Sequence, residues 1–264
     1  MKRRKKIQII FALSILAICS VFFMPAIRQN PLYHEFADRR NVLGIPNGLN
    51  VISNLPFLCV GLIGLNALLI KRSPIRIRFL YAVLFLGIIF TGIGSAYYHL
   101  YPDNARLVWD RIPMTVVFMS LLSATIAELI NQKIGVLLTV PFLLVGIFSV
   151  LYWYWGEAAG RGDLRIYALI QYYPVIILPI MMSLFYSPEH RPVIRLLQWA
   201  VFWYILAKGF EYFDRQIYSY VTISGHTLKH LAAAISTWYL VKTYFEKYPD
   251  VGHLASKSLG RREV

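Results

Sequence analysis

The chain has few cysteines and few charged residues, and both shortages narrow the classes of protein to which it can belong. Its 264 residues include two cysteines, Cys19 and Cys59, and only 15% of the residues are charged. Both cysteines fall in apolar stretches, which argues against a disulfide framework. The low charge content, together with 58% hydrophobic residues, argues against an ordinary soluble domain.

Long apolar segments account for most of the chain, and its mean hydropathy is +0.55. A helix of about 20 apolar residues spans the hydrocarbon core of a bilayer, which is ~30 Å thick. Eight windows reach this length: 8–27, 49–70, 79–98, 112–130, 134–155, 164–186, 193–211 and 226–244. They predict an all-α polytopic membrane protein with short loops, no soluble domain and no internal repeat.

Acidic residues are scarce, because 13 Asp and Glu stand against 27 Lys and Arg, for a net charge of +14. In a soluble protein this excess would suggest a nucleic-acid partner, but here the basic residues follow membrane topology. If residues 2–6 are cytoplasmic, the cytoplasmic segments hold about twice as many Lys and Arg as the external segments. Arg111 is counted in an external segment. We therefore expect cytoplasmic termini, in the cell membrane if the protein is prokaryotic, and no nucleic-acid partner.

The first apolar segment follows a basic tail, as in a signal peptide. No pattern of small residues for cleavage follows the run 21–24, so we expect residues 1–30 to form an uncleaved signal-anchor helix. Residues 31–245 would then form the core of the protein, and residues 246–264 a cytoplasmic tail.

A pair of histidines, His226 and His230, stands at the start of the last apolar window. Residues four apart share one face of a helix, a spacing at which both rings can bind one metal ion. Ionisable rings at membrane depth must be paired, hydrated or bound to metal. The pair therefore predicts a functional site.

Three more polar residues are expected at the same side of the membrane. Ser95 and His99 share a helical stripe at the end of the third window, and Asp110 follows a loop predicted over 100–109. Topology assigned from Lys and Arg alone thus brings five residues to the outer leaflet. Three imidazoles and one open position suit a catalytic zinc, which activates water and polarises a carbonyl. Asp110 would take the proton from that water, and Ser95 would donate to the oxyanion.

Each of these three residues also has a structural interpretation. Asp110 could cap a helix, Ser95 could be a small residue at a helix contact, and His99 could belong to an interfacial aromatic belt. Elsewhere, Lys208 and Glu211 are spaced for an intrahelical ion pair. Asp214 is a candidate third member of that pair's network.

The signature Ser95-x-x-x-His99, Asp110 and His226-x-x-x-His230, in this order on three predicted helices, resembles that of the CREST superfamily of membrane hydrolases. This superfamily includes alkaline ceramidases and adiponectin-receptor-like proteins. Sequence around these residues is most similar to the alkaline ceramidase/phytoceramidase branch, in particular its prokaryotic members. The resemblance implies a seven-helix CREST-type bundle, to which the N-terminal helix is an addition.

The resemblance also implies roles for the five residues. His99, His226 and His230 would bind Zn²⁺, Asp110 would act as general base towards the zinc-bound water, and Ser95 would stabilise the oxyanion. The implied reaction is hydrolysis of the amide of ceramide, or of a similar membrane lipid amide, to a sphingoid base or other amine and a fatty acid.

The sequence departs from the family pattern at one point, the calcium site. Animal members share a calcium site of acidic residues, but Pro46 stands where a Glu is expected and the stretch 38–41 is basic. This departure argues against calcium regulation.

The alternatives to a hydrolase are a non-catalytic, receptor-like membrane protein with a structural zinc, and a transporter, which would be expected to show repeated halves.

Overall fold

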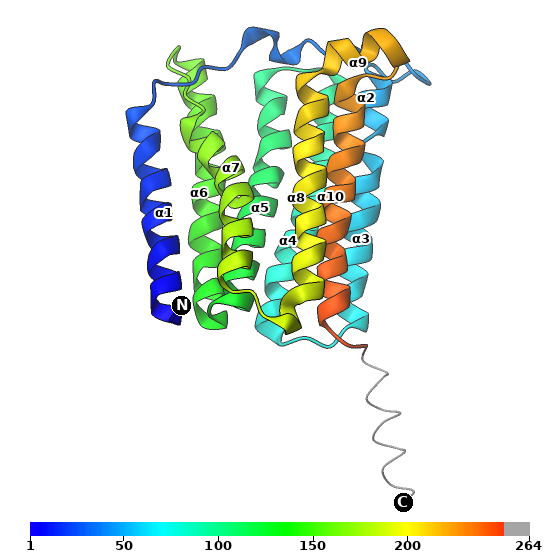
Figure 1. Cartoon of the computed structure of the whole chain (residues 1–264). Coiled ribbons are helices and arrows are strands. Elements are labelled where there is room, and N and C mark those ends of the chain that lie inside the picture. The colour runs from blue at the N-terminus through cyan, green and yellow to red at the C-terminus, as the bar shows by residue number, and fades with distance from the viewer. Residues whose placement is uncertain (251–264) are drawn as a thin grey trace, which may run out of the picture.

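A computed structural model describes residues 1–250, and these residues form a bundle of long, roughly parallel and antiparallel helices (Figure 1). Within residues 1–250, seven helices are long and apolar enough to cross a membrane. Their bounds are α1 (Arg3–Phe23), α2 with α3 (Gly48–Ile52 and Leu55–Ile70), α4 (Ile75–Leu100), α5 (Asn104–Leu129), α6 (Gln132–Ala158), α7 (Arg165–Leu184) and η2 with α8 (Pro188–His190 and Arg191–Tyr212). The predicted all-α, polytopic class is confirmed.

The last predicted window corresponds to α10 (Gly225–Lys247), which is as long as the other helices but more polar. It lies beside α8 and α3 in the bundle (Figure 1). Its polar residues at 226, 227 and 230 are buried, and they contact His99, Asn50 and Ser53 respectively. A polar helix is tolerated at membrane depth when its polar side chains face protein.

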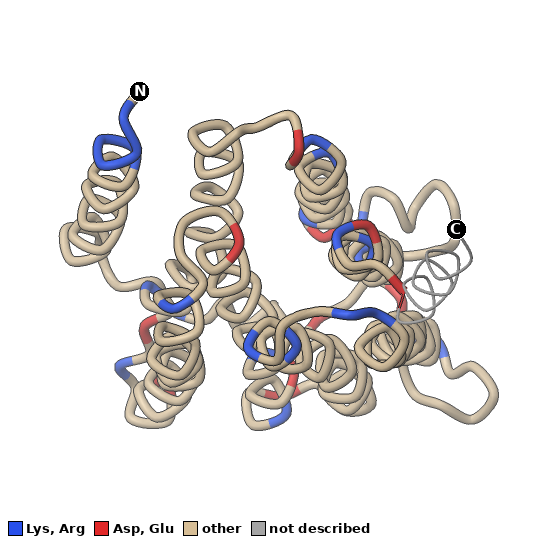
Figure 2. Tube along the Cα trace, turned by 90° about the horizontal axis from the view of Figure 1, so that it is seen from below, with Lys and Arg blue, Asp and Glu red and all other residues tan. Residues whose placement is uncertain are grey.

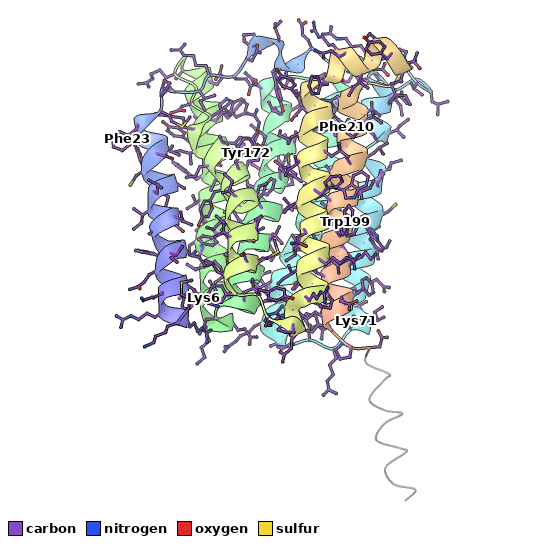
Figure 3. All side chains as sticks on the ribbon, in the orientation of Figure 1. Lys6, Phe23, Lys71, Tyr172, Trp199 and Phe210 are labelled. Atoms are coloured by element: carbon purple, nitrogen blue, oxygen red, sulfur yellow. The ribbon has the colours of Figure 1, made fainter. Side chains whose placement is uncertain are left out.

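The two ends of the bundle differ. The N-terminus and the end of α10 lie at one end, and η1 (Pro31–His34) and α9 (Asp214–Val221) lie across the other (Figure 1). Figure 3 shows Lys6 and Lys71 towards the first end and Phe23 towards the second. Figure 2 views the bundle from the first end, where basic residues mark the start of α1. Helix α9 was not expected from the apolar windows of the sequence.

The main hydrophobic core lies between α3, α4, α5, α7, α8 and α10. By contrast α1 contains no buried residue and stands at the edge of the bundle, where it contacts α7. This arrangement agrees with a first helix added to a seven-helix core. The domain boundaries drawn from the sequence stay predictions, and of the predicted tail the residues 251–264 lie outside the described part of the chain.

One boundary prediction is wrong in a way that affects the site. The ten-residue loop predicted over 100–109 is much shorter, because α5 already begins at Asn104. The carboxylate of Asp103 caps this helix by accepting a hydrogen bond from the backbone N–H of Arg106 at 2.7 Å. Asp110 consequently lies almost two turns inside α5 and does not cap it.

The second predicted window also differs from the structure. Residues 49–70 form two helices, α2 and α3, which are separated at Ser53 and Asn54. Both of these residues are buried, and both face α10 rather than solvent. The break therefore places two polar side chains against α10.

Candidate metal and catalytic site

Three histidines meet at the end of the bundle that carries α9. His99 comes from the last turn of α4, while His226 and His230 come from the first two turns of α10. Each pair of imidazole rings has its centroids 4.8 Å apart, and possible ligand atoms of all three lie within 4.8 Å of one another. All three side chains are buried. Residues from two distant parts of the sequence thus form one cluster.

The start of α10 is fixed by two local features. Ser224 is its N-cap, and the hydroxyl oxygen accepts a hydrogen bond from the N–H of Thr227 at 3.0 Å. Gly225 follows, and a Cβ there would lie 2.2 Å from the carbonyl oxygen of Phe210. Only glycine therefore allows α8 to approach the first turn of α10, where His226 stands.

Asp214 holds this turn from the other side. Its Oδ1 accepts a hydrogen bond from the backbone N–H of His226 at 2.7 Å, and its Oδ2 accepts one from the N–H of Ala37 at 3.0 Å. The suggestion that Asp214 joins the ion pair of Lys208 and Glu211 is wrong. Its carboxylate instead ties the loop before α2 to the first turn of α10, in which His226 stands.

Neighbouring side chains orient the imidazoles. Ser53 Oγ lies 2.8 Å from His230 Nδ1, which leaves Nε2 of His230 to face the other two rings. The ring of Phe36 packs on both His99 and His226, with centroids 4.6 and 4.4 Å apart. Partners of this kind fix ring orientation and shield a metal from solvent.

The donor set fits a metal ion. Tetrahedral zinc with imidazole ligands at ~2.0–2.1 Å places two ligand nitrogens roughly 3.3 Å apart. The Nε2 atoms of His99 and His226 are 3.2 Å apart. Among the described residues no Asp, Glu or Cys joins the three histidines, so this set of three leaves a position for water or substrate. Such an open site is typical of catalytic zinc.

Ser95 and Asp110 meet where α4 and α5 come closest. A Cβ at Gly94 would lie 2.0 Å from the carbonyl oxygen of Trp109, so a glycine is required at this contact. This close approach brings Ser95 on α4 and Asp110 on α5 to the lining of one cavity. Both side chains are buried.

A cavity connects these residues to the interior of the bundle. Ser95, Asp110 and His230 line one end of it. The remainder is mainly apolar and is formed by α5, α7, α8 and α10. Apolar residues such as Leu121 and Leu240 continue the lining towards the opposite end of the bundle. A mainly apolar cavity thus adjoins the polar residues.

A second charged residue of the cavity, Lys229, was missed in the sequence analysis. Its ammonium donates a hydrogen bond to Glu211 Oε1 at 2.7 Å, and Lys208 bonds to the other oxygen of the same carboxylate. The predicted ion pair between Lys208 and Glu211 is therefore confirmed, and Lys229 extends it across to α10. A lysine between two histidines of a membrane helix was the available signal, since such a charge requires a partner.

Arg111 was also misjudged, because it was counted among external basic residues. Its guanidinium is buried and lies over the ring of Trp153, 4.2 Å from the centroid, with Tyr167 and Tyr33 nearby. It donates a hydrogen bond to Gln29 Oε1 at 2.7 Å. Cation–π contacts stabilise this buried charge next to Asp110.

The fold and the site together define a class: a helical membrane protein with a buried three-histidine centre, an adjoining carboxylate and hydroxyl, and an apolar cavity. A family model described as Ceramidase matches residues 45–246, and the chain belongs to the Ceramidase family. Membership makes it a membrane-embedded hydrolase of an amide bond in a lipid, as the resemblance implied. The matched range contains all five candidate residues and excludes α1. A search of curated proteins found no match.

Proposed function

We propose that the protein is a zinc-dependent amidohydrolase that cleaves ceramide, or a similar long-chain lipid amide, into a sphingoid base or other amine and a free fatty acid. One observation carries this proposal. Ser95, Asp110 and His230 line one mainly apolar cavity, and His99 and His226 cluster with His230 beside it. A site of this composition matches the needs of amide hydrolysis in a lipid environment.

His99, His226 and His230 would hold the zinc ion, which supplies Lewis acidity to activate water and polarise a carbonyl. Asp110 accepts a proton from the attacking water as general base. Once protonated, Asp110 donates back to Ser95 Oγ, and this frees the Ser95 hydroxyl to donate to the developing oxyanion. Asp110 then returns the proton to the departing amine, so water adds across the C–N bond.

The substrate would lie with its acyl chain in the cavity and its amide at the level of the histidines. The site is at the end of the bundle opposite the N-terminus (Figure 1). With both termini in the cytoplasm, as the positive-inside rule indicates, the active site is directed to the outer leaflet. This placement suits a lipid that enters from that leaflet.

The roles are tested with Asp110→Asn, assayed for bound zinc and for release of fatty acid from ceramide. We expect zinc to be retained and turnover to fall by about two to four orders of magnitude, the usual contribution of a general base. Asp103→Asn is a matched control on the same helix, since Asn also caps helices, and it should stay active. Loss of zinc from Asp110→Asn would show that Asp110 is a ligand or a structural residue.

A further inference from the structure

Lys229 places a positive charge in the same cavity as the candidate catalytic residues. Its side chain is 14% exposed, and it lines the cavity together with Ser95, Asp110 and His230. The rest of the lining is mainly apolar, so a cation here is expensive unless it has a partner. Lys229 therefore requires a function or a full set of hydrogen bonds.

Its known partner compensates only part of this charge. Glu211 accepts hydrogen bonds from both Lys229 and Lys208, so two ammonium groups share one carboxylate. Among the described residues no other acid forms an ion pair with Lys229. The cluster of Lys208, Glu211 and Lys229 thus carries one excess positive charge.

Asp110 is the other charged residue of the lining, to which Ser95 also belongs. If Asp110 is ionised, these four side chains are neutral together, and a zinc ion at the histidines adds two positive charges. The cavity with its metal is therefore positive. A ligand that brings one negative charge is favoured there over a neutral ligand of the same shape.

We propose that Lys229 binds a carboxylate on the amine portion of the substrate, so that the preferred substrates are long-chain N-acyl amino acids. Lys229 is a specificity-determining residue of the amidohydrolase proposed above, and the inference rests on that function. The ammonium has three N–H donors, and the contact with Glu211 uses one. Hydrolysis adds water to the carbonyl carbon and breaks the C–N bond, which releases a fatty acid and an amino acid.

The geometry supports recognition and does not require Lys229 to exchange a proton. The hydrogen bond to Glu211 fixes the ammonium on α10, one residue before His230. A carboxylate bonded to it would stand close to the amide under attack, as in an amino acid, where one carbon separates the two groups. A charge-assisted contact of this kind in a dry cavity discriminates by about tenfold or more.

The test measures binding of two ether lipids that contain no amide, hexadecyloxyacetate and hexadecyloxyethanol, to the zinc-loaded full-length protein. The wild type should bind the carboxylate at least about tenfold more tightly than the alcohol. Lys229→Met should abolish this preference, while Lys229→Arg should keep it. Lys229→Met leaves Lys208 and Glu211 as a one-to-one pair, so the fold should tolerate the change.

Lys208→Met is the matched control, because it removes the same charge from the same carboxylate but from a residue that does not line the cavity. It should keep the preference. Equal binding of the two lipids by the wild type, persistence of the preference in Lys229→Met, or its loss in Lys208→Met would each overturn the inference.

Hydrolysis of N-palmitoylglycine, N-palmitoylethanolamine and ceramide is measured on the same samples. Faster turnover of N-palmitoylglycine by the wild type, lost in Lys229→Met, supports the inference. Turnover with no such preference overturns it and leaves the proposed function standing. Failure to hydrolyse any lipid amide refutes the proposed function itself, whereas the ether lipids report on Lys229 independently of hydrolysis.

Discussion

Glu211 compensates two ammonium groups at once, so its replacement tests whether the buried cluster is as tightly coupled as the structure indicates. Glu211→Gln keeps the shape of the side chain and removes the charge. Lys208 and Lys229 then face each other without a carboxylate, with side chains that are only 29% and 14% exposed. Removal of one partner from a buried ion pair destabilises a protein by about 3–5 kcal/mol.

Because Lys208 is partly exposed, we expect the lower end of that range, about 3 kcal/mol. For a chain of this size, each kcal/mol lowers the thermal midpoint by about 2–4 °C, so Glu211→Gln should unfold about 6–12 °C below the wild type. The assay is thermal unfolding of detergent-purified protein, followed by circular dichroism at constant pH and salt.

The double variant Glu211→Gln with Lys229→Met provides the internal check. It restores the excess charge of the cluster to that of the wild type, so it should recover part of the lost midpoint. A shift below about 2 °C for Glu211→Gln, or a double variant less stable than Glu211→Gln alone, would refute the description of these residues as one coupled cluster.

Two further predictions concern the surroundings of the site. Ser53→Ala removes the hydroxyl that lies 2.8 Å from His230 Nδ1. It should weaken zinc binding by about 10–100-fold without unfolding the protein, as measured by competition with a chelator. Unchanged affinity would show that the contact does not orient the imidazole ring. Asp38, in the loop before α2, has its pKa lowered by hydrogen bonds from Arg40. A carboxyl with a lowered pKa stabilises the fold above its unfolded pKa and loses this contribution as pH falls. Asp38→Asn should therefore unfold below the wild type at pH 7, and the difference should shrink as the pH falls below the ordinary pKa of an aspartate, about 3.9. A difference that does not shrink in acid would contradict the ion pair.

The parts of the site that sequence reasoning could reach are those that depend on spacing within one helix. The positions of His226 and His230 on one helix face follow from their separation of four residues, and the order of the helices brings His99 to the same end. The side of the membrane, expected from counts of Lys and Arg, stays a prediction. None of these steps needs knowledge of how two helices pack.

The parts that it missed depend on contacts between helices. The polar turn that begins at Asp103 has too little hydropathy to enter an apolar window, so the start of α5 and the depth of Asp110 were misplaced. The pairing of Lys229 with Glu211 joins α10 to α8, and a single sequence does not show which helices are neighbours. Phe36 lies in a loop with no periodicity to indicate that its ring covers the histidines.

The central claim is that three histidines hold a catalytic zinc. Its most direct test measures zinc content and fatty-acid release on the same detergent-purified sample, for the wild type and for His226→Ala. The substrates are ceramides and N-acyl amino acids of matched chain length. We predict about one zinc per chain with release of fatty acid from at least one lipid, and the loss of both in His226→Ala. Wild-type protein without zinc, or with zinc that His226→Ala retains, would contradict the account.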